Sequence, residues 1–207
     1  MLPMTIVIAI TGASGVAYGA RLLEVLKGHI TLIVSDGAGP IIEHEMGLKA
    51  KDLEERADAV FQNDDLSAPV ASGTATVEAM VIIPCSISTL GKVANGIADN
   101  LITRVATVCL KERWPLIVVP RETPLATVHL ENMARLSAMG AIVLPASPGF
   151  YNRPQKVDDM VDFVVGKVMN VLGQEQDLLA PWGGMEGKEK MNKEKGTHKD
   201  RKPCHGR

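Results

Sequence analysis

Short apolar runs alternate along the chain with longer stretches in which apolar residues recur on one helical face. Five of these runs are predicted to be β-strands, because they are short, rich in Val and Ile, and bounded by Gly, Pro or Ser. They are residues 5–11, 30–35, 79–85, 115–120 and 141–146. Most of them lack an alternation of apolar and polar residues, which is typical of strands buried on both faces of a parallel sheet.

The segments between the runs are predicted to be helices. The first helix reaches about Lys27 and the second ends near Leu48, and the others cover residues 89–113, 125–140 and 155–172. Strands that alternate with helices imply right-handed crossovers. The pattern therefore predicts an α/β fold, a doubly wound parallel sheet in a Rossmann-like three-layer sandwich.

Composition narrows the class of protein. The 207 residues, 46% hydrophobic, are enough for one sizeable core and short for two. Aromatic residues make up 3% and the formal net charge is −2, so we expect no nucleic-acid partner. No apolar run approaches the ~20 residues that span a bilayer, and the apolar N-terminus leads straight into a glycine turn, which indicates a first strand rather than a signal peptide.

The cysteines and the C-terminus bear on compartment and domain limits. Cys85, Cys109 and Cys204 cannot form a complete set of disulfides and have no metal-ligand spacing, so we expect a reducing, cytoplasmic setting. Residues 185–207 hold eight Lys or Arg and four acidic residues without apolar periodicity. We predict one domain over residues 1–184 and a basic, disordered tail; an arm that binds anions or a partner is the alternative.

A glycine-rich turn, "TGASG", joins the first strand to the first helix. Its small residues let backbone N–H groups and the positive end of the helix approach an anion, and Ser14 can add a hydroxyl donor. Many α/β proteins need glycine here only for a tight turn, so this alternative stays open. Ser35 ends the second strand at a comparable place.

Two further strand ends carry polar side chains. Ser86, Ser88 and Thr89 stand at a helix start after the third run; one hydroxyl is enough to cap the helix, and the surplus favours ligand contact. Arg121 and Glu122 follow the fourth run, where the alternative is a solvated ion pair. Open α/β sheets bind ligands at the carboxyl ends of their strands, so these groups are predicted to line one crevice.

Seven segments, in order over residues 5–184, resemble the UbiX-type flavin prenyltransferases: "TGASG", "PCSISTL", "NLITR", "LKERWPLIVVPRETPL", "HLENM", "GAIVLPASPGFYNRP" and "APWGG". The resemblance implies a flavodoxin-like subunit that binds reduced FMN and joins a dimethylallyl group from dimethylallyl phosphate to the flavin N5 and C6. The product, prenylated FMN, is the cofactor of UbiD-type decarboxylases. Family members are typically homododecamers with sites at subunit contacts, and no metal is implied.

The resemblance also implies a role for individual residues. Glu122 and Glu45 would act near the flavin ring, where a carboxylate stabilises a developing allyl cation or moves a proton. Charge-assisted hydrogen bonds of ~1.5–3 kcal/mol each would stabilise the departing phosphate. The groups implied for that phosphate are Ser14, Lys111, Tyr151 and Lys167, and those implied for FMN are Gly12, Ala13, Ser14, Ser35, Ser86, Ile87, Ser88, Thr89 and Arg121.

Lys167 departs from the family pattern, which usually has an arginine there. A lysine lacks the two-pronged geometry of arginine, so the choice between a monophosphate and a diphosphate donor is in doubt. Two other functions stay open: an FMN-binding accessory subunit of a decarboxylase without turnover, and a flavin-dependent cysteine decarboxylase. The second would need a Pro-x-Met-Asn-like loop and a basic His, whereas the loop here is "PCSIST".

Two motifs imitate metal sites. "DDMVD" resembles the aspartate-rich motif that binds magnesium diphosphate in isoprenoid synthases, and Asp158 and Asp162 share a helix face. It stands in the first turns of a predicted helix, where carboxylates stabilise the dipole, and no second copy completes a metal cluster. "HEMG" and His129 lack a partner at zinc spacing. We therefore expect a structural role for the aspartates and either a structural role or a place at the flavin edge for the histidines.

Overall fold

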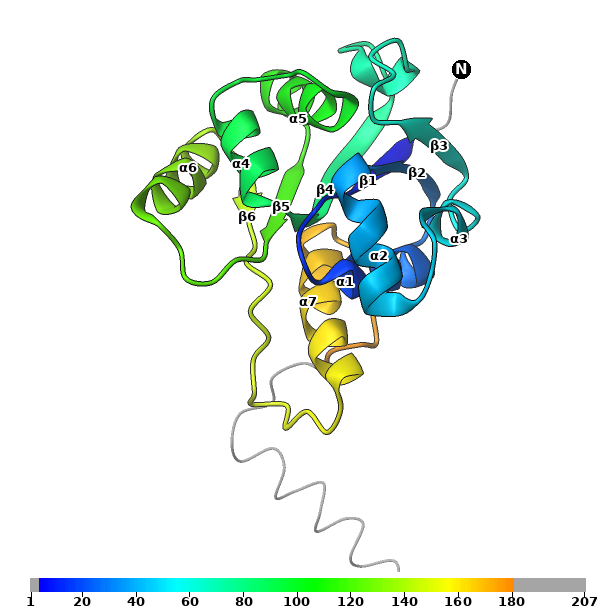
Figure 1. Cartoon of the computed structure of the whole chain (residues 1–207), viewed down its shortest axis with the longest axis vertical. Helices are drawn as coiled ribbons and strands as arrows, with labels where there is room; N and C mark the ends of the chain where they lie inside the picture. The colour runs from blue at the N-terminus through cyan, green and yellow to red at the C-terminus, as the bar shows by residue number, and fades with distance from the viewer. Residues whose placement is uncertain (1–3, 181–207) are drawn as a thin grey trace, which may run out of the picture.

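The structure is a computed structural model that describes residues 4–180, and a parallel β-sheet forms its centre (Figure 1). In this part of the chain six strands follow the order β3-β2-β1-β4-β5-β6, which is that of a doubly wound α/β fold. The predicted fold class is confirmed. The strands are β1 Thr5–Ile10, β2 His29–Val34, β3 Ala59–Gln62, β4 Val77–Cys85, β5 Leu116–Pro120 and β6 Ile142–Val143.

The central strand β1 is buried along its whole length. It pairs in parallel with β2, where Thr5 lies opposite His29, and with β4 on its other side. Alternate side chains point to opposite faces, so that Ile8 belongs to one hydrophobic cluster and Val7 to the other. Two buried faces require the uninterrupted apolar run that the sequence shows.

Helices cover both faces of the sheet (Figure 1). The layer with α1 and α7 shares a hydrophobic cluster with Ile8, and the layer with α4 and α5 shares the cluster of Val7. Helix α6 packs against α4. The helices are α1 Val16–Val25, α2 Gly39–Met46, α3 Ala50–Glu54, α4 Ile87–Ala94, α5 Leu101–Glu112, α6 Thr127–Ala138 and α7 Val157–Val171, with short 3-10 helices η1 Asp36–Ala38 and η2 Pro69–Ala71.

The single helix predicted over residues 89–113 is wrong, because two helices, α4 and α5, occupy this range. Gly96 between them has a φ of 70°, in the left-handed region that ends a helix. Asn100 then starts α5 as its N-cap, and its side chain accepts the N–H of Thr103 at 3.0 Å. The apolar periodicity runs through both helices and hides the break.

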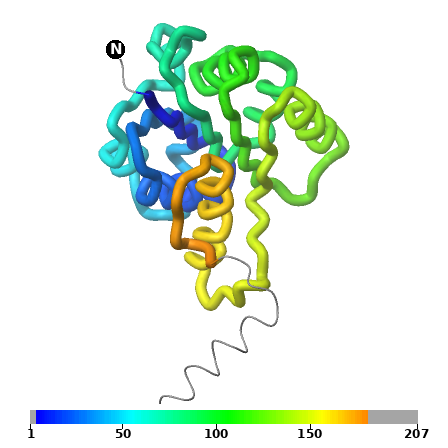
Figure 2. Tube along the Cα trace, turned by 180° about the vertical axis from the view of Figure 1, so that it is seen from behind, coloured from blue at the N-terminus to red at the C-terminus, as the bar shows by residue number. Residues whose placement is uncertain are grey.

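The prediction also missed β3 and made β6 too long. The four residues of β3 are half-buried or exposed at the edge of the sheet, so they form no apolar run. β6 has two residues, although Leu144 and Ala146 after it still donate to carbonyls of β5 at 2.9 and 3.0 Å. Residues 144–156, which we call the arm, lead away from the sheet after these hydrogen bonds and return as α7 (Figure 2).

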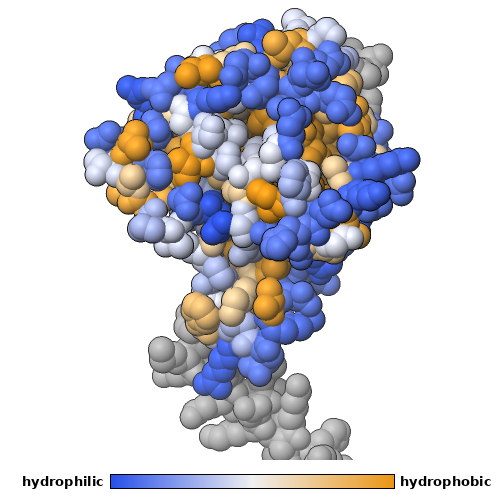
Figure 3. Space-filling model, in the orientation of Figure 1, coloured by the Kyte–Doolittle hydropathy of each residue, from blue (hydrophilic) through white to orange (hydrophobic). Residues whose placement is uncertain are grey.

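Apolar side chains are exposed on α6 and on the arm (Figure 3). They include Val128 and Leu130, exposed to 54% and 52%, and Phe150, exposed to 68%. None of the helices within residues 4–180 is long and apolar enough to cross a membrane. The predicted basic tail, residues 185–207, lies outside the described residues.

Candidate functional site

The glycine turn after β1 is shaped by two close approaches. Gly15 has a φ of 99°, and a Cβ at this position would lie 2.9 Å from the ring of Tyr18. A Cβ on Gly12 would lie 3.1 Å from the backbone of Gly37, in the loop after β2. The loops that follow β1 and β2 therefore meet at the carboxyl edge of the sheet, and Ser35 lies at the start of the second loop.

Thr11 joins the turn to the end of β4. Its buried hydroxyl donates to the carbonyl of Pro84 at 2.7 Å and accepts the N–H of Ser86 at 2.7 Å. This bridge fixes the start of α4 beside the glycine turn. Our sequence predictions did not include Thr11, although a hydroxyl directly after an apolar strand was a signal for it.

Of the three hydroxyls at the start of α4, two take part in the helix cap and one is exposed. Ser86 is the N-cap; its Oγ accepts the N–H of Thr89 at 3.2 Å and donates to the hydroxyl of Thr89 at 3.0 Å. Ile87 is half-buried and Ser88 is exposed. Two of the three hydroxyls thus build the helix start, and Ser88 faces outward from it.

Glu45 reaches the glycine turn from α2. Its Oε2 accepts the N–H of Gly15 at 2.9 Å and that of Val16 at 3.2 Å. Burial opposes the charge of the carboxylate, but hydrogen bonds from the Ser14 hydroxyl and these N–H groups, together with the charge of Arg121, hold the pKa of Glu45 below its ordinary value. Glu45 is therefore ionised at neutral pH.

Arg121 and Glu122 turn to different partners. The Nε of Arg121 donates to the carbonyl of Ser14 at 3.0 Å, while a carboxylate oxygen of Glu122 accepts the N–H of Thr123 at 3.0 Å. No ion pair between Arg121 and Glu122 is found within residues 4–180. Glu122 is exposed, so its carboxylate is accessible at the carboxyl end of β5.

Tyr18 is a further residue that the sequence predictions omitted. Its ring packs on Gly15, and burial raises the pKa of its phenol while the nearby charge of Arg121 lowers it. Tyr18 therefore lies near both the turn and Arg121. A tyrosine on the first turn of an amphipathic helix gave no sequence signal for this position.

Tyr151 and Lys167 form a second cluster around Phe163. The rings of Tyr151 and Phe163 meet edge to face with centroids 5.6 Å apart, and the Nζ of Lys167 lies 5.9 Å from the centre of the Phe163 ring. The arm supplies Tyr151 and α7 supplies the other two. Two of the residues predicted for the substrate phosphate are thus brought together.

Lys111 lies at the other edge of the sheet. Helix α5 ends at Glu112 and leads into β5 at Leu116, so its last turn stands at the amino ends of the strands. Lys111 pairs there with Glu112 and lies close to Gly73, which precedes β4. At about 3.3 Å per residue, the six residues of β1 separate the two edges by roughly 20 Å.

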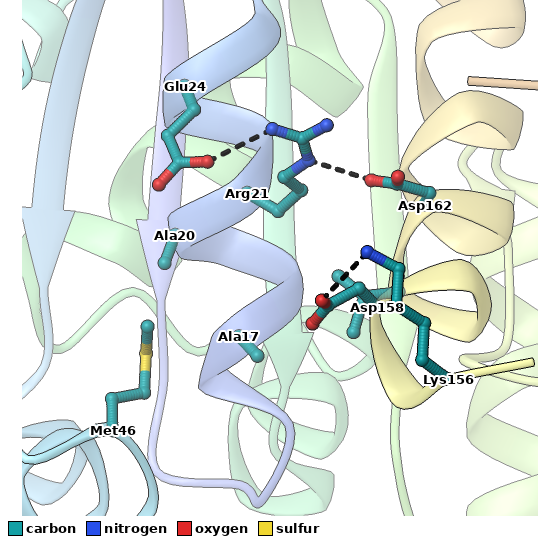
Figure 4. Close-up of a pocket in the computed structure, with 9 residues that line it drawn as sticks. Ala17, Ala20, Arg21, Glu24, Met46, Lys156, Asp158 and Asp162 are labelled. Carbon is teal, nitrogen blue, oxygen red and sulfur yellow. Dashed lines mark hydrogen bonds and ion pairs between the residues drawn. The ribbon is translucent and has the colours of Figure 1, made fainter.

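A groove of about 400 Å³ separates α1 from the start of α7 (Figure 4). Arg21 on α1 donates to Asp162 on α7 at 2.7 Å and to Glu24 at 3.1 Å. Asp158 pairs with Lys156 at 3.3 Å. Both aspartates that imitate a metal motif thus have cationic partners, and the pair of Arg21 and Asp162 ties α1 to α7. No group of three or more potential metal ligands is found among the described residues.

Cys85 ends β4 within the candidate site but is not a nucleophile. Its thiol donates to the carbonyl of Ser86 at 3.6 Å. Burial raises its pKa to about 12, so the thiolate is not populated at neutral pH.

His129, which the sequence analysis considered as a zinc ligand, has a partner in the backbone. Its Nδ1 accepts the N–H of Ala126 at 3.2 Å at the start of α6.

Comparison with known proteins identifies the family. Residues 2–169 match the Flavoprotein family. Flavin prenyltransferase UbiX of Methanothermobacter thermautotrophicus is 51% identical over 184 residues, which cover 87% of this chain and 96% of that protein. This chain belongs to the UbiX-type flavin prenyltransferase family. The resemblance noted in the sequence is thereby confirmed.

Solved structures of UbiX-type proteins share the fold. The dodecameric FMN-dependent UbiX-like decarboxylase from Escherichia coli O157:H7 is 40% identical, covers 87% of this chain and 100% of its own, and superposes with a TM-score of 0.85. AnUbiX (PadA1), in complex with FMN and dimethylallyl pyrophosphate, is 34% identical over 88% of this chain and 99% of its own, with a TM-score of 0.86.

Proposed function

We propose that this UbiX-type protein is a flavin prenyltransferase that transfers a dimethylallyl group from dimethylallyl phosphate to N5 and C6 of reduced FMN. The observation that supports it best is the gathering of the glycine turn, Ser86, Glu45 and Arg121 at the carboxyl ends of β1, β4 and β5. This is where open α/β sheets bind ligands. The 51% identity with a flavin prenyltransferase points to the same activity.

The flavin would lie across the strand ends. The groups proposed to hold it are the backbone and side chains of the turn after β1, Ser35 after β2, the start of α4 and Arg121. Thr11 and Tyr18 would position them, because Thr11 bonds to Ser86 and Tyr18 packs on Gly15. The residues proposed for direct contact are Gly12, Ala13, Ser14, Ser35, Ser86, Ile87, Ser88, Thr89 and Arg121.

In the proposed reaction the bond between the allyl carbon and the phosphate oxygen breaks and two bonds to the flavin form. The flavin loses a proton at N5 and another at C6, one proton is added at the former prenyl double bond, and the second leaves with the phosphate as hydrogen phosphate. Ser14, Lys111, Tyr151 and Lys167 would stabilise the departing phosphate with hydrogen bonds, which are charge-assisted at the two lysines. Glu122 would stabilise positive charge on the allyl group or accept a proton.

A complete site requires more than one copy of the chain. Lys111 stands at the amino edge of the sheet, whereas Glu122 stands at the carboxyl edge. We propose that a neighbouring copy supplies Lys111 in a homododecamer like that of the Escherichia coli neighbour. The apolar side chains exposed on α6 and on the arm offer surface for such contacts.

The product is proposed to serve a UbiD-type decarboxylase. We expect the cytoplasm as the compartment, because Cys85 and Cys109 are free thiols buried in the fold, which suits a reducing setting. Because Lys167 stands where the family usually has an arginine, the prenyl donor is either the monophosphate or the diphosphate ester.

The test is the mass of the flavin. Purified protein mixed anaerobically with reduced FMN and dimethylallyl phosphate is expected to yield a flavin heavier by one prenyl group, measured by mass spectrometry. A parallel reaction with dimethylallyl diphosphate decides between the two donors. A flavin that binds tightly but keeps its mass with both donors would contradict the proposal and favour an accessory flavin-binding subunit.

A further inference from the structure

Phe163 contacts two of the side chains that are proposed for the substrate phosphate. It lies on α7 and is 8% exposed, as part of the hydrophobic cluster that α7 shares with the sheet. Tyr151, from the arm, is 43% exposed, and Lys167 is exposed one turn further along α7. A buried aromatic ring therefore contacts two polar side chains that reach the surface.

Lys167 lies against this ring because of the helix geometry. Residues four apart lie on the same face of a helix, and the Nζ of Lys167 lies over the Phe163 ring at 5.9 Å from its centre. The face of an aromatic ring attracts an ammonium at this distance. Within residues 4–180 no carboxylate pairs with Lys167, so the ring orients its charge without neutralising it.

Tyr151 meets the same ring edge to face. The two ring planes are inclined by 76°, which is a favoured arrangement of an aromatic pair. The rings meet over Gly149, where a Cβ would lie 2.9 Å from Cζ of Phe163 and 3.0 Å from Cε1 of Tyr151. The φ of Gly149 is not positive, so the space between the rings, rather than the backbone conformation, requires glycine here.

We infer that Phe163 is a positioning residue for the phosphate of the prenyl donor, because one ring holds both Tyr151 and Lys167. The inference rests on the proposed function and deepens it. A phenol and an ammonium that are already oriented lose less conformational entropy when the phosphate binds. The ring also supplies the fixed orientation that a lysine, unlike an arginine, lacks by itself.

The test measures the affinity of the protein loaded with oxidised FMN for dimethylallyl phosphate by calorimetry. No transfer accompanies binding, since the proposed reaction uses reduced FMN. Phe163→Leu keeps an apolar side chain in the core but removes the ring. It is expected to bind the ester roughly three- to tenfold more weakly than the wild type, the range of aromatic and cation–π contacts.

A second variant shows whether the ring acts through the lysine. Lys167→Met removes the cation that the ring holds and keeps a long side chain. Phe163→Leu is expected to cost less affinity when it is added to Lys167→Met than when it is made alone. An undiminished loss would mean that the ring supports only the fold, and it would overturn the inference.

Phe61→Leu is the matched control, because Phe61 is half-buried on β3 and packs against the cluster on the other face of the sheet. It is expected to bind the ester as the wild type does. Wild-type affinity in Phe163→Leu, an equal loss in both leucine variants, or no binding by the wild type would each overturn the inference. Gly149→Ala replaces Phe163→Leu if the latter does not fold, because its Cβ separates the two rings, and the same loss is expected.

Binding and turnover are separate measurements, so the two proposals can fail separately. A flavin that keeps its mass, together with weaker binding of the ester by Phe163→Leu, would contradict the proposed function alone. A prenylated flavin, together with unchanged binding by Phe163→Leu, would contradict only the role of Phe163.

Discussion

A single hydroxyl, that of Thr11, connects two of the strand ends that form the candidate site. It bonds to the carbonyl of Pro84 and to the N–H of Ser86, and the side chain is 1% exposed. At the same scale, Arg121 and Glu122 are neighbours in sequence but have separate partners, Ser14 and Thr123. Glu122 therefore does not neutralise Arg121, and its carboxylate is accessible to a ligand.

Replacing Glu122 by glutamine tests its role. The amide keeps the size of the side chain but removes the charge and the basic oxygen, so Glu122→Gln is expected to bind reduced FMN normally. Its turnover is expected to fall by about 100-fold, the scale of a lost acid–base group. Flavin binding is measured by fluorescence titration and turnover by product mass.

Glu55→Gln is the control for charge alone, because Glu55 is an exposed carboxylate at the end of α3 and lies on neither α6 nor the arm. It is expected to retain full turnover. Wild-type rates in the Glu122 variant would show that its carboxylate takes no part in the reaction.

The helices of the two layers satisfy their first N–H groups in different ways. At the start of α5, Leu101 donates to the carbonyl of Asn63 at 2.7 Å, Ile102 to the Asn63 side chain at 3.2 Å, and Thr103 to the Asn100 side chain at 3.0 Å. Helix α1 depends instead on Glu45, 30 residues along the chain. The hydrogen bonds at the start of α5 therefore stabilise the fold, while the start of α1 belongs to the candidate site.

Removal of the α5 cap is expected to weaken the fold without changing the site. Asn100→Ala loses the acceptor for Thr103 and should lower the free energy of unfolding by ~0.5–2 kcal/mol. Urea denaturation at one fixed protein concentration measures the change. Asn100→Ser keeps a capping oxygen and is expected to lie close to the wild type; equal stability of all three proteins would mean that the cap contributes nothing.

At the scale of the whole molecule, the residues proposed for the reaction are divided between two edges of one sheet. The glycine turn, Ser86, Arg121 and Glu122 lie at the carboxyl edge, and Lys111 lies at the amino edge. A rigid sheet of buried strands cannot bring these edges together. We propose that an assembly of identical copies solves this geometry, because each copy would offer its amino edge to one neighbour and its carboxyl edge to another.

Mixed assemblies provide the corresponding prediction. Lys111→Ala and Glu122→Gln are each expected to keep about 1% of wild-type activity or less when alone. Co-expression should restore about a quarter of wild-type activity, because one site in four then combines an intact Lys111 from one copy with an intact Glu122 from another. Tagged copies and product mass measure composition and activity.

The pair Ser14→Ala and Glu122→Gln serves as the negative control, since both changes lie at the carboxyl edge and no mixture rebuilds an intact edge. Recovery in this pair, or none in the first, would rule out a shared site.

The sequence allowed the prediction of features that depend on neighbouring residues, and missed those that depend on distant segments. The apolar runs predicted β1, β4 and β5, and the polar residues after them predicted the carboxyl edge. The edge strand β3 was not predicted, because a half-exposed strand needs no apolar run. The contact of Glu45 with Gly15 joins separate elements and has no local signal. The location of Lys111 follows from topology, since a helix that leads into a strand ends at that strand's amino end.

The polar groups of the candidate site have partners within the chain itself. Thr11 has both a donor and an acceptor partner, Glu45 occupies the N–H groups of the turn, and every buried side-chain nitrogen or oxygen within the described residues has a partner. A ligand that leaves this site would therefore leave no buried polar side chain of the described residues without a partner, so its release carries no desolvation penalty from such groups.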